Sequence, residues 1–375
     1  MLAFFSASTR MVNSRRAVAE CLDAAMGEGR HHCDLIMINA SIGHDYSELL
    51  DEARKRVPGA RVVGSSCGGI VGRVGVSESM KVVARMMVRG ASELAVAQVD
   101  GIYAHNSFER SAELARRLKA ANSAVNMVYF LASGIDIADD LCIAGIESVL
   151  GPDITIFGAT SSDNMKGMAC YQLVDDQVCE HSAVAVGFAD PTLEVVTQAT
   201  HGFVAVGDPM IATRSEGNRI IELDGRPAWS VYTQRLGLDD SATCGDTIPV
   251  GALAELLPEQ QALEYGNKHI LRAVTKRDED GSMYYATTCP EGTRLWLTVR
   301  DENLIFSDMD RMMKQIISRG AGRELVAVFH ADCLARGRFM FNRVMKEELV
   351  GRMQFPLAVD GELPPWLGMY LSLIH

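Results

Sequence analysis

An arginine and two aspartates have the side-chain chemistry to hold a small charged molecule. Arg336 ends an apolar run and opens a helical segment, where its guanidinium can bind a carboxylate through two hydrogen bonds or can simply lie on a helix surface. Asp163 and Asp332 each follow an apolar run. Either carboxylate can bind an ammonium group, or can cap the turn or helix that follows it. An unpaired buried charge is costly. A ligand bound by these residues must therefore pair with their charges in one pocket from which water is partly excluded.

Two segments of small residues follow apolar runs and predict loops. Such loops can hold an anion or a small polar ligand through unobstructed backbone N–H groups, although tight turns have the same composition. Neither segment continues as the Gly-Lys-Ser/Thr of a P-loop, so nucleotide binding is not supported. The segments are Gly64, Ser65, Ser66, Cys67, Gly68 and Gly69, and Gly158, Ala159, Thr160, Ser161, Ser162, Asp163 and Asn164.

Cysteine and histidine residues offer two further chemistries. Cys67 and Cys333 can act as nucleophiles near a cation or a helix N-terminus, but no histidine is tied to either by a known motif, which favours small buried thiols. His330 follows a strand-like run and is a possible haem ligand, although a lone histidine more often makes an ordinary hydrogen bond. No metal site is predicted, and no catalytic residue is assigned.

The elements that must position these residues form three copies of one pattern: a strand, a helix and a second strand. Such units are parallel βαβ units whose ligands tend to lie beyond the carboxyl ends of the strands. We therefore expect an α/β chain with mixed sheets covered by helices and with the small-residue loops at one edge of each sheet. The predicted elements are strand 33–40, helix 45–57, strand 60–63 and strands 80–89 and 93–99 in the first copy; strand 125–131, helix 138–149, strand 154–157 and a hairpin of 169–174 and 181–188 in the second; and strand 324–330, helix 336–350 and strand 366–370 in the third.

Composition limits the function classes. The 375 residues predict two domains, and a net charge of -12 lacks the basic patch that nucleic-acid binding needs. No apolar run approaches the roughly 18 residues of a membrane span, and the N-terminus does not resemble a signal peptide. Nine scattered cysteines without a Cys-x-x-Cys pair favour reduced thiols. We therefore expect a cytoplasmic protein that binds neither nucleic acid nor membrane.

Several stretches of the sequence resemble the FIST domains of intracellular signal transduction proteins. The two small-residue segments resemble motifs of the FIST N-terminal domain, and Cys333, Arg336 and Gly337 resemble the Cys-x-x-Arg-Gly signature of the FIST C-terminal domain. The resemblance covers roughly 20–370 and predicts two domains, 1–225 and 226–370. The stretches around the end of the first domain are Gln198-Ala199-Thr200-His201-Gly202, Val206-Gly207-Asp208-Pro209 and Asn218-Arg219-Ile220-Ile221-Glu222-Leu223-Asp224-Gly225-Arg226-Pro227-Ala228.

The resemblance implies a ligand-binding sensor rather than an enzyme, with an amino acid or a similar small polar molecule as the ligand and no cofactor. Arg336 would bind the carboxylate of an amino acid, and Asp163 or Asp332 its amine. Some relatives bind haem and sense nitric oxide, so a haem-dependent gas sensor is the alternative, with a cysteine-dependent enzyme as a third reading. We expect the signal to pass to a separate partner, such as a histidine kinase or a cyclic-di-nucleotide enzyme.

The C-terminal end departs from the family pattern. The family closes with a strand and a Gly-Glu-Ile-Gly loop, whereas here residues 366–370 are followed by Leu371-Ser372-Leu373-Ile374-His375. This pentapeptide is also encoded by a common sequencing adapter. We therefore expect 371–375 to be an artefact and the natural protein to continue with a third loop.

Overall fold

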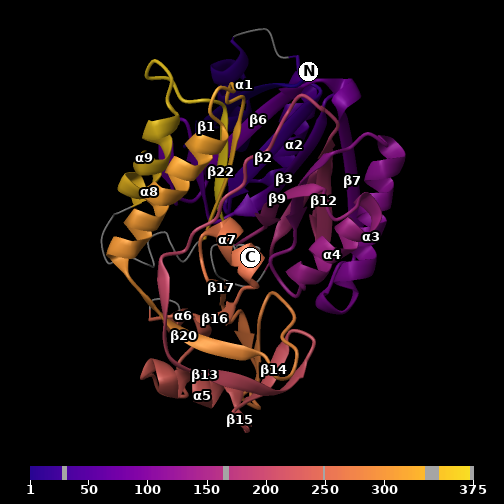
Figure 1. Ribbon diagram of the computed structural model, residues 1–375. Coiled ribbons are helices and arrows are strands. Elements are labelled where there is room, and N and C mark those ends of the chain that lie inside the picture. Colours follow the sequence, from indigo (N-terminus) through magenta and orange to yellow (C-terminus); the bar gives the residue numbers. More distant parts are fainter. Residues whose placement is uncertain (28–31, 164–168, 248–249, 334–345, 372–375) are drawn as a thin grey trace. The chain divides into compact units, whose positions relative to one another are not determined.

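The computed structural model describes the chain except for residues 28–31, 164–168, 248–249, 334–345 and 372–375 (Figure 1). The chain forms two compact units. Of the described residues, unit 1 comprises those within 1–135, 142–196 and 320–371, and unit 2 those within 136–141 and 197–319.

A six-stranded sheet forms the first part of unit 1. Helices α1 (Ser14–Met26) and α2 (Tyr46–Arg56) cover one of its faces, because each helix presents an apolar stripe at helical spacing. The side chain of Asn13 caps α1, and that of Asp45 caps α2. In order across the sheet, the strands are β1 (Ala3–Thr9), β6 (Val83–Arg89), β2 (Leu35–Ser41), β3 (Arg61–Cys67), β10 (Tyr171–Val174) and β11 (Gln177–Glu180).

The second sheet of unit 1 repeats the same design with helices α3 (Ser107–Ala121) and α4 (Asp139–Leu150), and unit 1 includes α4 from residue 142 onwards. The predicted hairpin of 169–174 with 181–188 is wrong. Asp175, at a φ of 51°, lets the chain turn from β10 into β11, and the segment from 182 onwards joins this other sheet instead. In order, the strands are β7 (Leu94–Asp100), β12 (Ser182–Phe188), β8 (Met127–Ala132) and β9 (Thr155–Thr160), with short 3-10 helices at Ala91–Glu93 and Ala104–Asn106.

The third sheet joins the C-terminal repeat to the first repeat. Strand β22 (Trp366–Leu371) runs parallel to β21 (Val328–Cys333) and antiparallel to β4 (Gly69–Gly72), which also pairs with β5 (Gly75–Ser77). Helix α9 (Lys346–Gln354) and a 3-10 turn at Phe355–Leu357 lie between β21 and β22 in the sequence. The predicted helix 336–350 lies partly outside the described residues.

All three predicted parallel strand pairs are confirmed, as β2 with β3, β8 with β9 and β21 with β22. The mixed sheets with helices confirm the α/β class. The compact units do not coincide with 1–225 and 226–370, because the C-terminal repeat pairs with β4 and so belongs to unit 1.

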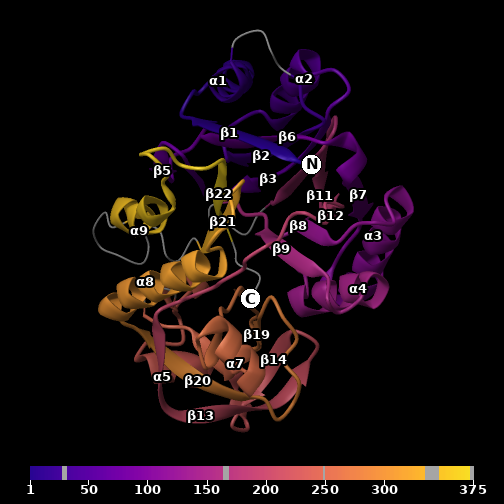
Figure 2. The same cartoon turned by 45° about the horizontal axis from the view of Figure 1, so that its top comes forward.

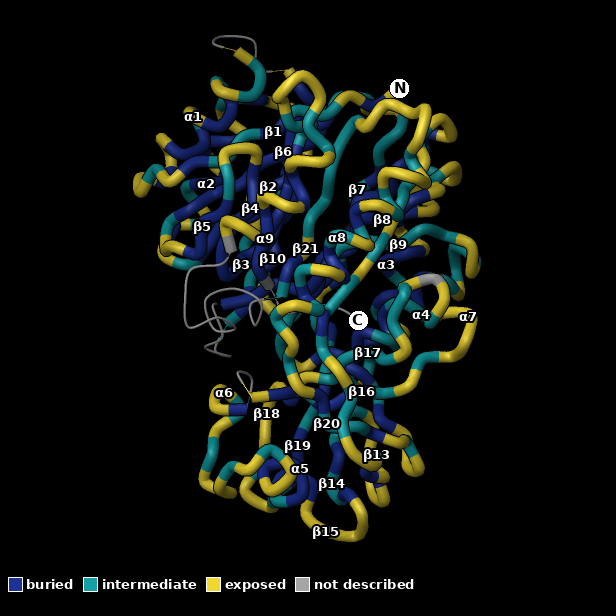
Figure 3. Tube along the Cα trace, turned by 60° about the vertical axis from the view of Figure 1, so that its left-hand side comes forward, coloured by how far each residue is buried: buried dark blue, intermediate teal, exposed yellow. Residues whose placement is uncertain are grey.

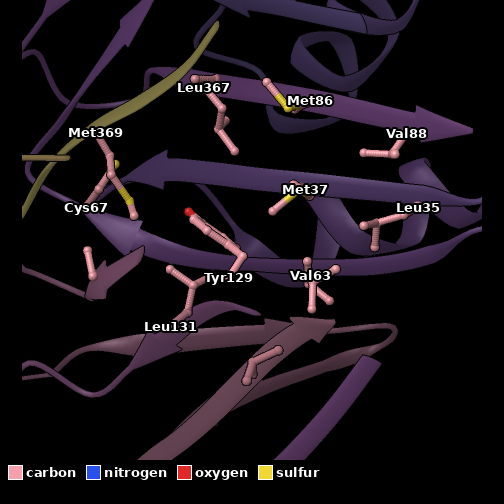
Figure 4. Close-up of a cluster of buried hydrophobic side chains, with 14 of the residues drawn as sticks. Leu35, Met37, Val63, Cys67, Met86, Val88, Tyr129, Leu131, Leu367 and Met369 are labelled. Carbon is pink, nitrogen blue, oxygen red and sulfur yellow. The ribbon is translucent and has the colours of Figure 1, made fainter. Parts of the chain in front are cut away.

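One of the hydrophobic cores of unit 1 is shared by the three repeats. Side chains from β2, β3, β6, β8, β12 and β22 meet there, among them Met37, Met86 and Tyr129 (Figure 4), and β2 is buried along its whole length (Figure 3). Phe329 of β21 packs against Tyr129 and Phe157 with ring centroids 5.1 Å apart. Met37, Leu131 and Leu367 are buried in this core. Each such side chain contributes roughly 1.5–3 kcal/mol to the free energy of folding, so the three repeats stabilise one another.

Unit 2 is built on an eight-stranded antiparallel sheet (Figure 2). Its core contains Trp229 and Tyr232 of α5 (Ala228–Leu236). Its other helices are α6 (Cys244–Thr247), α7 (Glu259–Tyr265) and α8 (Glu302–Arg319). In order, the strands are β17 (His269–Arg272), β16 (Leu253–Leu256), β20 (Arg294–Arg300), β13 (Phe203–Glu216), β14 (Arg219–Leu223), β19 (Met283–Tyr284) and β18 (Lys276–Arg277), with β15 (Arg226–Pro227) paired to β14.

Candidate functional site

The carboxyl ends of strands from all three repeats meet at one edge of unit 1. The backbone N–H of Ser162, just after β9, donates to the carbonyl of Ser66 in β3 at 3.0 Å. The N–H of Gly68 donates to the carbonyl of Tyr370 in β22 at 2.7 Å. Asp332 in β21 lies opposite Tyr370 in the register of the parallel pair β21 and β22. The structure thus brings parts of both small-residue segments and the strand that carries Asp332 together at one edge, whereas the repeat pattern predicted the segments at one edge of each separate sheet.

The prediction of a loop is wrong for 64–67, for residue 69 and for 158–160, whereas 161–163 lie outside any strand as predicted. Residues 64–67 belong to β3, residue 69 begins β4, and residues 158–160 end β9. A Cβ at Gly64 would lie 2.1 Å from the carbonyl oxygen of Ile38, and a Cβ at Gly158 would lie 1.9 Å from that of Phe130. These glycines therefore allow neighbouring strands to approach closely, and the N–H groups of β3 are used in the sheet rather than offered to an anion.

Most serine hydroxyls of this edge join strands to one another. Ser66 Oγ accepts the N–H of Tyr171 at 3.0 Å, and Ser65 Oγ donates to Asn39 Oδ1 at 3.4 Å. Ser161 Oγ donates to the carbonyl of Ala132 at 2.9 Å and accepts from the Gln172 side chain. Ser162, which is 3% exposed, takes part through its backbone N–H, which donates to Ser66 as described above.

Two buried carboxylates lie beside these serines. Asp163 is 6% exposed, and its Oδ2 accepts the N–H of Ala169 at 3.2 Å. Asp332 is 2% exposed, and its Oδ2 lies 3.8 Å from His330 Nε2. These are two buried carboxylates at the edge where the strand ends meet, and each has contacts of its own within the protein. Arg336 and Asn164 lie outside the described residues.

Two tyrosines near this edge were missed by the sequence analysis, because they lie outside the small-residue segments. Tyr46, the first residue of α2, packs its ring 5.4 Å from that of Tyr171, and its hydroxyl has no hydrogen-bond partner among the described residues. Burial raises the pKa of the Tyr46 hydroxyl above its usual range. No sequence signal singles out Tyr46, since a tyrosine at the start of an amphipathic helix is ordinary.

The cysteines and histidine considered above have ordinary surroundings. Cys67 is wholly buried in the shared core, and this burial raises the pKa of its thiol to about 12. Cys333 is half-buried at the end of β21. His330 packs edge-on against Trp366, with ring centroids 5.8 Å apart. The described part of the chain contains no group of three His, Cys, Asp or Glu residues that could hold a metal ion.

Comparison with known proteins identifies both halves of the chain. The FIST N domain matches residues 34–226, and the FIST C domain matches 228–359. No curated protein matches the chain. Among solved structures, a cyanuric acid hydrolase from A. caulinodans matches at 12% identity, with a TM-score of 0.28, over 51% of this chain and 71% of that one. This likeness is too weak to support a statement about fold or activity.

FIST domains are sensory domains of signal transduction that take small ligands. In the described ranges, no helix is long and apolar enough to cross a membrane. The matched regions together account for most of the sequence. The chain therefore belongs to the FIST family, with a FIST N domain followed by a FIST C domain.

Proposed function

We propose that this protein senses an amino acid, which binds at the edge of unit 1 where the ends of β3, β9 and β22 meet. One observation carries the proposal. The backbone N–H of Ser162 donates to Ser66, and that of Gly68 donates to Tyr370, so hydrogen bonds join strand ends of all three repeats at one edge. Strand ends of this kind are where α/β proteins commonly bind ligands.

The buried carboxylates give the proposed site its chemistry. Asp163 or Asp332 would bind the ammonium group of the ligand, and Arg336, by the sequence pattern, its carboxylate. The hydroxyls of Ser162 and Tyr46 are polar groups that could orient the ligand. Because the surrounding side chains are buried, little water would compete for these bonds.

The proposed function is binding without catalysis and without a cofactor. A nucleophilic cysteine requires thiolate, and burial raises the pKa of Cys67 to about 12, so this thiol stays protonated at neutral pH. His330 contacts the ring of Trp366 and the carboxylate of Asp332. Neither contact favours a role as haem ligand over that of an ordinary polar side chain. We further propose a cytoplasmic location and a separate signalling partner, such as a histidine kinase or a cyclic-di-nucleotide enzyme, because FIST domains are sensory domains of signal transduction.

A thermal-shift screen against amino acids and haem tests the ligand. A ligand at one hundred times its dissociation constant adds about 2.7 kcal/mol to the free energy of unfolding, which raises the melting temperature measurably. We expect one class of amino acids to raise it. We also expect Asp332→Asn and Arg336→Ala to reduce this shift.

The matched control is Asp153→Asn, because Asp153 is an exposed aspartate of the same unit. This variant should retain the full shift. A shift with haem alone would replace the amino-acid proposal with the gas-sensor reading. An equal shift in all variants would remove Asp332 and Arg336 from the binding site.

A further inference from the structure

Arg85 of β6 is a buried cation without a partner among the described residues. It is 0% exposed, and none of its three guanidinium nitrogens makes a hydrogen bond within the described part of the chain. Buried polar groups are nearly always paired in folded proteins, and a guanidinium has five N–H donors. A buried guanidinium whose donors are all unused therefore requires an explanation.

The strand pattern fixes the face of the sheet on which Arg85 lies. Successive side chains of a strand point to opposite faces. Ala84 and Met86, its neighbours in β6, belong to the core that the three repeats share, whereas Val83 and Met87 pack with α1 and α2. Arg85 therefore lies on the face of the six-stranded sheet that α1 and α2 cover (Figure 2).

The surroundings of Arg85 on this face are apolar. In the antiparallel registers of the sheet, Arg85 lies opposite Ala7 of β1 on one side and Ile38 of β2 on the other. The helices also bury apolar residues against this face, namely Ala17, Val18 and Leu22 of α1 and Leu49, Leu50 and Ala53 of α2. The guanidinium is thus a positive charge within an apolar layer.

Two carboxylates of the covering helices have other partners. Glu52 of α2 is 7% exposed, and its Oε1 accepts from Arg56 Nε at 2.7 Å. Glu20 of α1 accepts from the hydroxyl of Thr9 at 2.7 Å. Across the described ranges, no carboxylate forms an ion pair with Arg85. The protein chain shown here therefore does not offset this charge.

The charge persists at neutral pH. Burial lowers the pKa of the Arg85 guanidinium to about 10, while Cys21 and Glu52 act in the opposite direction. A group with this pKa is protonated at pH 7. Because an uncompensated buried charge is strongly destabilising, a counter-ion beside Arg85 stabilises the folded state.

The features of the layer favour a small monovalent anion. One guanidinium offsets one negative charge, so a doubly charged sulfate or phosphate would leave net negative charge buried. A halide ion accepts N–H bonds from any direction, which suits a guanidinium whose donors are all unused. It also needs little more room than the single water molecules that folded proteins commonly enclose.

We propose that Arg85 binds a chloride ion between the six-stranded sheet and helices α1 and α2. The ion offsets the buried charge, so the packing of both helices on the sheet depends on chloride. This site lies on the helix-covered face, whereas the proposed amino-acid site lies at the carboxyl ends of the strands. Neither proposal depends on the other.

Thermal unfolding in sodium chloride and in sodium gluconate, at equal ionic strength, tests the proposal. An ion at ten times its dissociation constant multiplies the ratio of folded to unfolded protein about elevenfold, which raises the melting temperature by a few degrees. We expect this chloride effect in wild type. Arg85→Met removes the charge but keeps a long side chain, so it should fold and lose the effect. The difference between the two proteins cancels the action of the salts on the exposed surface.

Arg16→Met is the matched control, because Arg16 is an exposed arginine of α1, and it should retain the chloride effect of wild type. Crystals of wild-type protein grown in sodium bromide locate the ion without any variant. We expect an anomalous bromide peak beside the Arg85 guanidinium. The proposal is overturned if wild type and Arg85→Met respond equally to chloride, or if the crystal shows only water or the Glu52 carboxylate beside Arg85.

Discussion

At the residue scale, the environment of a carboxyl group decides its role more than its place in the sequence does. Asp163 and Asp332 were identified as candidates because each follows an apolar run, and the structure buries both at the shared edge of unit 1. Asp139 attracted no attention in the sequence, because an aspartate at a helix start usually caps or lies exposed. Its contacts with 286–288, far along the chain, bury it, and no local pattern reports such a contact.

The raised pKa of Asp139 predicts a particular dependence of stability on pH. The unfolded chain ionises Asp139 near its ordinary pKa of about 3.9, whereas the folded chain still holds the proton there. The folded state thus binds more protons, so this group makes the protein less stable as the pH rises. Asparagine cannot ionise, so Asp139→Asn should gain stability relative to wild type between about pH 4 and pH 7.

Urea unfolding of the two proteins at both pH values measures this difference. Asp208→Asn, at an exposed aspartate of the same unit, is the control, and its stability relative to wild type should not change in this way. The difference in free energy of unfolding between Asp139→Asn and wild type should be larger at pH 7 than at pH 4. An equal difference at the two pH values would show that the buried carboxyl does not hold its proton.

At the element scale, the order of elements was predictable and the small-residue segments were not. Apolar runs alternating with amphipathic runs identified the parallel pairs, because burial imposes those periodicities directly. Glycine and serine favour turns, which led to the prediction of loops over 64–69 and 158–164. In this fold the strands pack so closely at Gly64 and Gly158 that only glycine fits, a requirement that depends on strands distant in the sequence.

Gly64→Ala tests this interpretation of the glycines. The new Cβ would lie 2.1 Å from the carbonyl oxygen of Ile38, so β2 and β3 would have to move apart. We expect a loss of about 1–3 kcal/mol or more in the free energy of unfolding, measured by urea titration.

Gly351→Ala is the matched control, because a Cβ at Gly351, inside α9, meets nothing within 4 Å. Alanine is the better helix former, so this variant should be as stable as wild type or more stable by up to about 1 kcal/mol. Equal effects of the two substitutions would contradict the close-packing explanation.

At the scale of the whole molecule, the sequence indicated three repeats, and the structure shows how they are used. The C-terminal repeat does not stay with the residues that precede it, since β22 pairs with β4 and contributes Leu367 and Met369 to the core of the first two repeats. Hydrophobic periodicity identifies which residues are buried but not which distant strand covers them. The pairing of β22 with β4 could therefore not be predicted. The proposed site depends on the pairing of β22 with β4, because the N–H of Gly68 donates to the carbonyl of Tyr370 in β22.

Hydrogen–deuterium exchange of the complete chain, with and without the amino acids that raise its melting temperature, tests the central claim most directly. A ligand bound where the repeats meet should slow exchange in peptides covering 61–72, 155–163 and 366–371 together, because it would hold the three strand ends in place. Peptides of unit 2 serve as the internal comparison. Slowing in those three segments is the result we predict, and slowing confined to unit 2, or to one repeat alone, would contradict the proposed sensory site.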